Sequence, residues 1–269
     1  MLAGLAPARR RLILAVMTLL AAGLVVLGTV VFAGTTGTAP RPKPAPQLRP
    51  GPVLLVPGYG GATGGLQSLA DRLTAAGRDA TVVPLPGNGT GDLSASANAL
   101  GAAVTAALAR TGDRSVDLVG YSAGGVVARL WVADGHADVV RRVVTLGSPQ
   151  HGTALADLAG RIAPDQCPLA CSELATNSAV LARLNAGDET PAGPTWVSIW
   201  TTQDSTVTPP DSARLAGALN LTVQSVCARA QITHGELPTS PLVQQIVLSE
   251  LRAGPPVPLG AADCARLAG

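Results

Sequence analysis

Residues 116–130 read VDLVGYSAGGVVARL, and they constrain the architecture of the chain more tightly than any other segment. The run VDLV is typical of a buried β-strand, and the residues from Gly125 onward are typical of a helix. Between them, Gly120–Gly124 fits the pattern G-x-S-x-G. A sharp strand-to-helix turn strains its serine and crowds the positions two residues away, which must therefore be small. The segment predicts that the Ser122 hydroxyl is exposed at the carboxyl edge of a sheet, beside a helix N-terminus that favours negative charge.

Apolar runs alternate with amphipathic stretches on both sides of this turn. Strands are predicted at Val53–Val56, Ala80–Leu85, Val116–Val119, Val140–Leu146, Trp196–Thr201 and Leu221–Val226. Helices are predicted at Leu66–Ala76, Leu93–Ala109, Ala123–Ala133, Ser172–Asn185 and Leu242–Leu251. Short buried strands that alternate with helices are typical of a parallel sheet covered on both faces. The sequence therefore predicts an α/β domain with about six mainly parallel strands.

A serine hydroxyl is a poor nucleophile without a neighbouring base, and the chain contains three histidines. His234 follows the last predicted strand, in a loop at the carboxyl edge of the sheet, and it is the predicted base. His151 follows another strand near the same edge. It is the less favoured alternative, and otherwise a residue that braces the loop beside the site. His136 is interpreted as a solvated residue at the end of the helix that follows Ser122.

A carboxylate that orients the base is expected between the serine and the last histidine, at the carboxyl end of a strand. Asp204 follows the strand Trp196–Thr201 by three residues and is the favoured acid. The competing residues are Asp157, Asp165 and Asp188, which lie in the connecting segment, and Asp211, which is typical of a helix N-cap.

Stabilising an oxyanion takes two backbone N–H donors, one of them from the residue after the nucleophile. That residue is Ala123. The second donor is expected in the loop after the first strand, where residues 56–61 read VPGYGG. Glycine permits the close backbone approach that such a loop requires, and the N–H of Tyr59 is the candidate. An ordinary glycine-rich turn is the alternative interpretation of this loop.

No cofactor or metal site is predicted from the sequence. The chain lacks the H-E-x-x-H pattern of zinc enzymes and the glycine-rich patterns that bind nucleotide phosphates. The histidines also lack metal-ligating partners at a suitable spacing. Lys43, the only lysine, lies in a proline-rich segment, which excludes Schiff-base chemistry in the body.

The N-terminal residues have a composition of their own. Residues 1–11 are a basic region that ends in three arginines, and residues 12–33 are an uncharged, largely apolar run of 22 residues. At about 1.5 Å per residue, this run is long enough to cross the ~30 Å hydrocarbon core of a bilayer. Two interpretations stay open: a retained signal anchor, with its arginines in the cytoplasm, and a cleavable signal peptide. In both interpretations residues 52–269 are exported, and the proline-rich residues 34–51 link them to the N-terminal segment.

Charge and cysteine content agree with an exported enzyme. Only 13% of the residues are charged, against about 25% in average proteins, and six residues are aromatic. This composition argues against a nucleic-acid partner or a long glycan groove. From Pro52 onward the chain carries 13 basic and 17 acidic residues, a net charge of −4. Four cysteines allow three pairings. We favour Cys167–Cys171, a small loop around Pro168, and Cys227–Cys264, which ties down the C-terminal tail.

Taken together, these features resemble the α/β-hydrolase superfamily and, within it, the small secreted bacterial lipases and esterases of the class 2 lipase group. The resemblance is carried by Val53–Gly60, Gly120–Gly124, Thr145–Thr153, Asp204 with Val207 and Pro209, and His234-Gly235. It covers residues from about Pro52 to Arg252. The five features in this order are specific to the superfamily and much less specific to a substrate.

The resemblance implies an α/β-hydrolase fold in which Ser122, Asp204 and His234 form the catalytic triad. The N–H groups of Tyr59 and Ala123 would form the oxyanion hole. One departure is visible, because the family usually has histidine before glycine in the first loop and this chain has Pro57. The donor is a backbone N–H, so this substitution is compatible with an oxyanion hole, and different hydrogen bonds would then hold the loop in place.

The segment between the fourth and fifth predicted strands contains about 45 residues with little strand character. This length predicts no large cap domain, only a small partial cover over a substrate channel. Four apolar residues of the segment are interpreted either as the lining of an acyl pocket or as ordinary core residues. They are Leu155, Leu158, Ile162 and Leu169.

These observations predict an exported serine hydrolase that cleaves carboxylic esters through an acyl-enzyme, similar to triacylglycerol lipases and esterases, with an ester or a lipid as its substrate. An acyltransferase, a thioesterase or an amidase would use the same triad. A membrane-tethered binding protein on an inactive hydrolase scaffold is the alternative from another class. If residues 12–33 are not cleaved, the membrane is a further partner.

Overall fold

The computed structural model describes residues 6, 8, 17–19 and 44–268. The predicted basic region and the predicted apolar segment 12–33 therefore lie almost entirely outside the described residues. Among the residues that are described, no helix is long and apolar enough to cross a membrane. The described residues from 44 to 268 belong to one compact unit of the chain.

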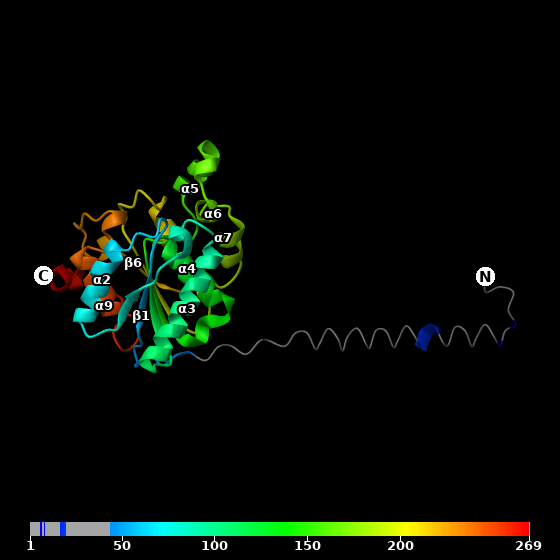
Figure 1. Ribbon diagram of the computed structural model, residues 1–269, viewed down its shortest axis with the longest axis horizontal. Coiled ribbons are helices and arrows are strands. Elements are labelled where there is room, and N and C mark those ends of the chain that lie inside the picture. Colours follow the sequence, from blue (N-terminus) through cyan, green and yellow to red (C-terminus); the bar gives the residue numbers. More distant parts are fainter. Residues whose placement is uncertain (1–5, 7, 9–16, 20–43, 269) are drawn as a thin grey trace. The chain divides into compact units, whose positions relative to one another are not determined.

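A single six-stranded sheet forms the centre of the described body (Figure 1). Its strands are β1 (Val53–Val56), β2 (Ala80–Val82), β3 (Val116–Tyr121), β4 (Val140–Leu146), β5 (Thr195–Trp200) and β6 (Leu219–Thr222). All neighbouring strands run parallel, in the order β2-β1-β3-β4-β5-β6. The chain reverses its direction of travel across the sheet between β1 and β3, and in open α/β sheets ligands bind at this kind of switch point.

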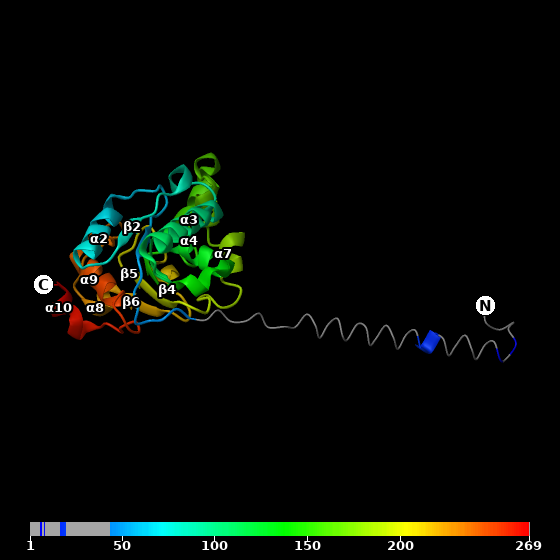
Figure 2. The ribbon, with the colours of Figure 1, turned by 60° about the horizontal axis from the view of Figure 1, so that its bottom comes forward.

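Helices cover both faces of the sheet. The main ones are α2 (Gly64–Ala75), α3 (Leu93–Thr111), α4 (Ala123–Trp131) and α9 (Pro241–Glu250). In Figures 1 and 2, α2 and α9 lie on one face, and α3 and α4 lie on the other. Alternate residues of each strand enter opposite cores: Leu54 and Leu118 pack on the α3–α4 side, whereas Val53 and Val119 pack on the α2–α9 side. This two-sided burial accounts for the mostly apolar sequences of the strands.

Shorter elements connect these layers. The α-helices are α5 (Ala154–Ile162), α6 (Leu169–Glu173), α7 (Ala179–Leu184), α8 (Val223–Val226) and α10 (Cys264–Ala268). The 3-10 turns are η1 (Pro86–Gly89), η3 (Ala137–Val139), η4 (Pro164–Gln166), η5 (Pro210–Ala213), η6 (His234–Glu236) and η7 (Ala261–Asp263), and η2 (Val132–His136) is a π-helical turn.

Three predicted elements are wrong in type or extent. The predicted strand Ala80–Leu85 ends at Val82, shortly before Pro84, which has no N–H to donate to a sheet. Local side-chain hydrogen bonds explain the other two. The predicted strand Leu221–Val226 ends at Thr222, because the Thr222 hydroxyl accepts the N–H of Ser225 and starts α8. The predicted helix Ser172–Asn185 is two helices, α6 and α7. It breaks before Ser178, whose hydroxyl caps α7 by accepting the N–H of Leu181.

A buried ionic cluster joins the amino ends of β3 and β4 to both ends of the body. The Asp117 carboxylate, fully buried, accepts hydrogen bonds from Arg141 at 2.8 and 2.5 Å and from Arg78 at 2.6 Å. The Arg141 guanidinium also donates to the backbone carbonyls of Gln47 and Leu251. The cluster therefore attaches the segment before β1 and the segment after α9 to the sheet edge opposite the one that carries Ser122.

Two disulfides are present, Cys167–Cys171 and Cys227–Cys264, and these are the favoured pairs. The first joins the end of η4 to α6. The second joins the end of α8 to α10 and so holds the C-terminal helix against the body.

Candidate active site

Ser122 occupies the turn between β3 and α4 with a strained backbone. Its φ of 53° and ψ of −127° lie in a region that residues other than glycine rarely adopt. The turn leaves no room for larger neighbours. A Cβ on Gly120 would lie 2.4 Å from the Cα of Gly125, and a Cβ on Gly124 would lie 2.1 Å from the carbonyl oxygen of Val56. The small residues of the motif are therefore required by the packing of this turn against β1 and α4.

Three residues from distant parts of the sequence form a hydrogen-bonded chain at the carboxyl edge of the sheet. The Oγ of Ser122 lies 3.0 Å from Nε2 of His234, whose Nδ1 lies 2.7 Å from Oδ2 of Asp204. A carboxylate only accepts hydrogen bonds, so Nδ1 carries the proton and Nε2 is free to accept the serine proton. His234 begins η6, and Asp204 lies in the loop after β5.

The acidic end of this chain is buried and fully bonded. Asp204 is 5% exposed and His234 is 7% exposed. The second carboxylate oxygen of Asp204 accepts the backbone N–H groups of Thr206 at 2.9 Å and Val207 at 2.8 Å. These bonds fix the carboxylate so that its other oxygen faces the imidazole.

Tyr121 contributes a contact that the motif does not reveal, because its position in G-x-S-x-G accepts any residue. Its hydroxyl donates to the carbonyl oxygen of His234 at 3.2 Å, and the two rings lie 5.2 Å apart between centroids. Burial, together with the negative charge of Asp204, raises the pKa of Tyr121 to about 12. The phenol therefore stays neutral and can hold the histidine loop in place across the physiological pH range.

The loop after β1 comes very close to the nucleophile. A Cβ on Gly58 would lie 2.9 Å from the Cβ of Ser122, so only glycine permits this approach. The N–H of the next residue, Tyr59, donates no hydrogen bond within residues 44–268. Ala123 begins α4, and the first N–H groups of a helix have no partner inside it. Two free backbone donors are thus available beside Ser122.

The other histidines lie apart from this chain. His151 braces a loop, because its ring nitrogens lie 3.2 Å from the carbonyl oxygen of Ser212 and 2.9 Å from the carboxylate of Glu189. His136 is half-buried and stacks on Trp131 with 4.6 Å between ring centroids, so its predicted solvation is only partial.

None of the competing carboxylates bonds to His234, whose Nδ1 partner is Asp204. Asp157 accepts two hydrogen bonds from Thr176, and Asp188 accepts two from Thr190. Asp165 lies exposed in η4. Asp211 lies within η5 and is not its N-cap, which is Pro209.

A pocket of about 280 Å³ opens at Ser122. It is lined by Tyr59, Ser122, Pro149, Thr153, Leu155, Ala156, Ala159, Gln166, Cys171, Leu174, Thr206 and Val207. Most of these groups are apolar. The volume lies just below the range of about 300–1,000 Å³ that is typical of pockets for drug-sized ligands, so the pocket suits a small apolar group.

The four apolar residues of the connecting segment were interpreted together, as pocket lining or as core, but they do not share one environment. Leu155 lines the pocket, whereas Leu158, Ile162 and Leu169 do not. All four are exposed, and Ile162 is 73% exposed, so the alternative interpretation as core residues is wrong. Leu155, Leu158 and Ile162 recur at helical spacing along α5. This apolar row begins at the pocket with Leu155 and continues on the exposed surface with Leu158 and Ile162.

Comparison with known proteins agrees with this architecture. A family model described as the alpha/beta hydrolase fold matches residues 51–166, a range that includes Ser122 but ends before Asp204 and His234. A comparison with curated protein sequences finds no match.

Two solved structures of known enzymes are similar in fold. Lipase B of Aspergillus fumigatus shares 20% identity with a TM-score of 0.65, over 82% of this chain and 60% of that chain. The mature form of the Bacillus licheniformis lipase BlEst2 shares 24% identity with a TM-score of 0.55, over 68% of this chain and 86% of that chain. The present chain therefore spans less than two thirds of the fungal lipase chain. With its six-stranded parallel sheet and no large cap over the described site, this protein has the α/β-hydrolase fold.

Proposed function

We propose that the protein is an exported serine hydrolase that cleaves carboxylic esters, with Ser122, His234 and Asp204 as its catalytic triad. The observation that carries the proposal is the continuous hydrogen-bonded chain from the serine hydroxyl through the imidazole to a buried carboxylate. A serine needs such a base to attack a carbonyl carbon, and the base needs a fixed orientation.

Each residue has a defined role in this reaction. His234 Nε2 takes the proton from Ser122 as Oγ attacks the ester carbon, and Asp204 stabilises the imidazolium that forms. The N–H groups of Tyr59 and Ala123 bind the oxyanion of the tetrahedral intermediate. His234 then protonates the leaving alcohol, and the Ser122 ester is released by a water molecule that His234 deprotonates.

The apolar pocket supports an ester with a short or medium acyl group. Its walls offer apolar contacts and few polar groups, which suits an acyl chain better than a charged or sugar substrate. The similarity in fold to lipases from a fungus and from a bacterium agrees with this substrate class.

A nucleophile substitution tests the proposal. Ser122→Ala is expected to lower the hydrolysis of p-nitrophenyl butyrate by about 10⁶-fold, to background, because the attacking oxygen is removed. Ser94→Ala, at an exposed position in the first turn of α3, is the matched control and keeps full activity. A fluorophosphonate probe is expected to label Ser122 in the native protein. Turnover by Ser122→Ala at the native rate would rule the proposal out.

Export is the second part of the proposal. Residues 1–11 and 12–33 would direct the chain out of the cytoplasm, residues 34–51 would act as a linker, and residues 52–269 would form the enzyme. The two disulfides support an oxidising compartment. Mass spectrometry of the mature N-terminus distinguishes a retained anchor from a cleaved peptide. Recovery of the full chain in the cytoplasm with free thiols would contradict export.

A further inference from the structure

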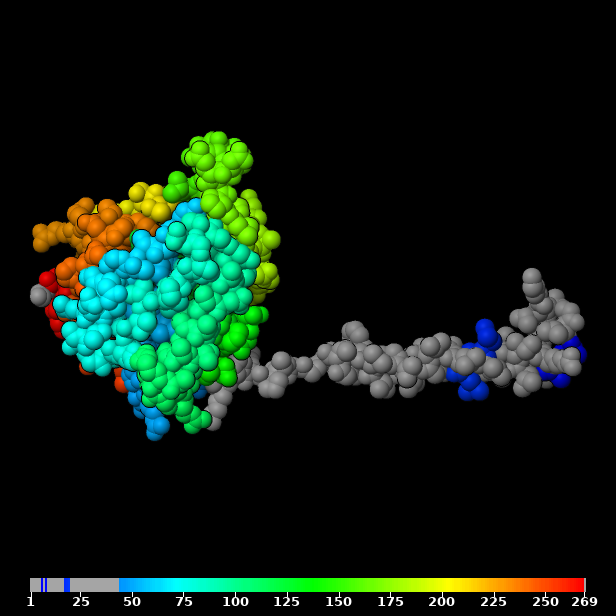
Figure 3. Space-filling view, viewed as in Figure 1, coloured from blue at the N-terminus to red at the C-terminus, as the bar shows by residue number. Residues whose placement is uncertain are grey.

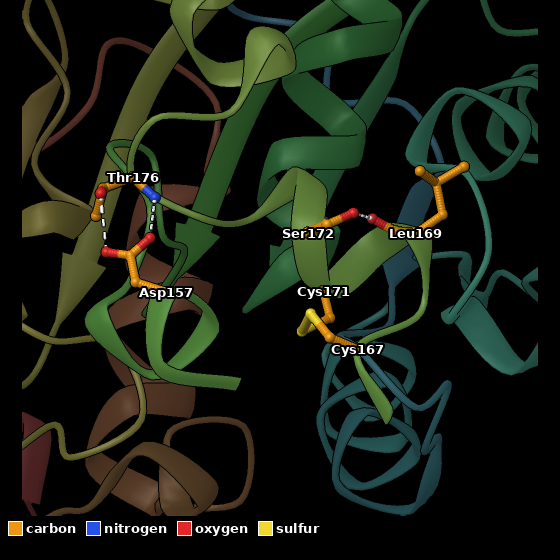
Figure 4. Close-up of a disulfide and its surroundings, with 6 residues drawn as sticks. All are labelled: Asp157, Cys167, Leu169, Cys171, Ser172 and Thr176. Carbon is orange, nitrogen blue, oxygen red and sulfur yellow. Dashed lines mark hydrogen bonds between the residues drawn. A yellow bond between two sulfur atoms is a disulfide. The ribbon is translucent and has the colours of Figure 1, made fainter. Parts of the chain in front are cut away.

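One disulfide belongs to the wall of the pocket at Ser122. Cys171 lines this pocket together with Gln166 and three residues of α5, namely Leu155, Ala156 and Ala159. Cys167, the partner of Cys171, directly follows η4. The wall therefore consists of α5, η4 and α6. The disulfide connects the residue after η4 to α6 (Figure 4).

The first half of α5 is held firmly by hydrogen bonds to the body. The Thr153 hydroxyl accepts the N–H of Thr208 at 3.1 Å and donates to the carbonyl oxygen of Thr206 at 2.7 Å. The Asp157 carboxylate accepts the N–H of Thr176 at 2.9 Å and its hydroxyl at 2.8 Å (Figure 4). These bonds fix the part of the wall that lies near the start of α5.

The second half of α5 and η4 are held differently. From Leu158 to Cys167, every hydrogen bond within residues 44–268 stays inside α5, η4 and the residues that join them to each other and to Cys167. The segment projects from the body, in light green at the top of Figures 1 and 3. Besides the polypeptide backbone, the disulfide from Cys167 to Cys171 therefore connects this segment covalently to α6.

The other side of the disulfide rests on a fixed support. The N–H of Ala170, which is fully buried, donates to the carbonyl oxygen of Thr90 at 3.1 Å. The Glu173 carboxylate accepts the N–H of Leu93 at 2.8 Å. Thus α6 is tied to the start of α3, and through the disulfide it positions η4 and the end of α5.

We infer that the Cys167–Cys171 disulfide sets the acyl-length specificity of the active site. It holds Gln166 and the second half of α5 against α6, and so closes the pocket to the distal carbons of a long acyl group. A short acyl group contacts mainly the half of the wall that Thr153 and Asp157 hold. This inference rests on the proposed ester hydrolysis at Ser122.

The size of the disulfide loop agrees with a local role. The two cysteines are four positions apart, whereas Cys227 and Cys264 are 37 positions apart. The stabilisation that a disulfide gives to the whole fold grows with the length of the loop that it closes. The short loop therefore acts mainly on the position of the wall, and the long loop acts mainly on global stability.

The experiment measures kcat/KM for p-nitrophenyl butyrate and decanoate in three full-length proteins. They are the native protein, Cys167→Ala/Cys171→Ala and the matched control Cys227→Ala/Cys264→Ala. The ratio of decanoate to butyrate is expected to rise about tenfold in the first variant, the lower end of the discrimination that a pocket exerts per methylene. The control variant is expected to keep the native ratio. Dithiothreitol reduces the disulfides of the native protein but leaves the sulfur atoms of Cys167 and Cys171 in place. The reduced protein is expected to show the same rise in the ratio, which distinguishes the effect of the broken bond from the effect of smaller side chains.

A second variant keeps the inference testable if the first does not fold. Ala159→Leu retains the disulfide and fills the pocket, so the ratio of decanoate to butyrate is expected to fall about tenfold. Each of three outcomes would overturn the inference. The ratio could stay unchanged in Ala159→Leu, it could stay unchanged in both Cys167→Ala/Cys171→Ala and the reduced protein, or it could rise equally in the control variant. If the native protein hydrolyses neither ester, the proposed function itself fails, and this outcome is distinct from a native enzyme whose ratio the disulfide does not affect.

Discussion

Gly147 offers a sharp test of the hydrogen bond between His234 and Asp204. It follows β4 with a φ of +54°, and a Cβ at this position would lie 3.1 Å from Nδ1 of His234 and 3.2 Å from Oδ2 of Asp204. The same Cβ would lie 2.6 Å from a terminal methyl of Leu237, which can move. The substitution Gly147→Ala therefore pushes a methyl group against the two atoms that orient the base.

The magnitude follows from two separate effects. An alanine in a left-handed conformation costs about 1–2 kcal/mol, which corresponds to a loss of roughly 2–8 °C in Tm for a domain of this size. A displacement of the imidazole by up to ~1 Å costs about a hundredfold in rate. We therefore expect Gly147→Ala to lower kcat/KM about a hundredfold, or by about 2.7 kcal/mol of transition-state stabilisation.

Gly112 provides the matched control, because it ends α3 with a φ of 74° and a Cβ there would meet nothing within 4 Å. Gly112→Ala is expected to lose a similar amount of Tm and to keep the native kcat/KM. The measurements are calorimetric Tm and kcat/KM for p-nitrophenyl butyrate. If the two variants retain kcat/KM within about threefold of each other, far short of the hundredfold loss that misplacement predicts, the reasoning from the His234–Asp204 contact is refuted.

Three further predictions address the acid, the second disulfide and a buried carboxyl group. Asp204→Asn is expected to lower kcat about 10⁴-fold, because an amide favours the wrong histidine tautomer; a loss of less than tenfold in steady-state assays would exclude its role. Loss of the Cys227–Cys264 disulfide by double alanine substitution is expected to lower the free energy of unfolding in urea by about 4 kcal/mol, against about 2 kcal/mol for the short disulfide loop, and equal losses would contradict the loop-length argument. Burial raises the pKa of Glu250 from 4.5 to about 7. The unfolded chain therefore releases this proton first as pH rises, so native stability falls between about pH 4.5 and 7, by at most about 3 kcal/mol. Glu250→Gln is expected to remove this part of the pH dependence of urea unfolding, and a difference between variant and native protein that does not vary with pH would count against it.

The sheet was largely predictable because its strands are buried on both faces. The segment Val53–Val56 is a continuous apolar run, and Val140–Leu146 is apolar except for Arg141, Arg142 and Thr145; both predictions match the observed bounds. Turns were predicted less well, because single hydroxyl groups decide them. Thr222 ends β6 and begins α8, and a polar residue in that position is compatible with either structure until its hydrogen-bond partner is known.

The candidate site divides in the same way. The motif around Ser122 specifies its own backbone geometry, because a strained turn tolerates only small neighbours, and chain order then favours His234 and Asp204. The supporting contacts of Tyr121 and Gly147 have no local signal, since each depends on a loop that returns from a distant part of the chain.

Local pattern was enough to predict a parallel α/β sheet, a serine at its carboxyl edge and the two pairs of cysteines. Tertiary structure decided where those pairs lie: Cys171 lines the pocket at Ser122, and Cys227 is bonded to the first residue of the C-terminal helix. The apolar residues of α5 look alike in sequence, yet Leu155 lines the pocket while Ile162 faces solvent. The reason is physical: local sequence specifies backbone geometry and an apolar stripe, but the direction in which the stripe faces depends on contacts outside the helix, here the hydrogen bond from Thr176 to Asp157 and the disulfide between Cys167 and Cys171.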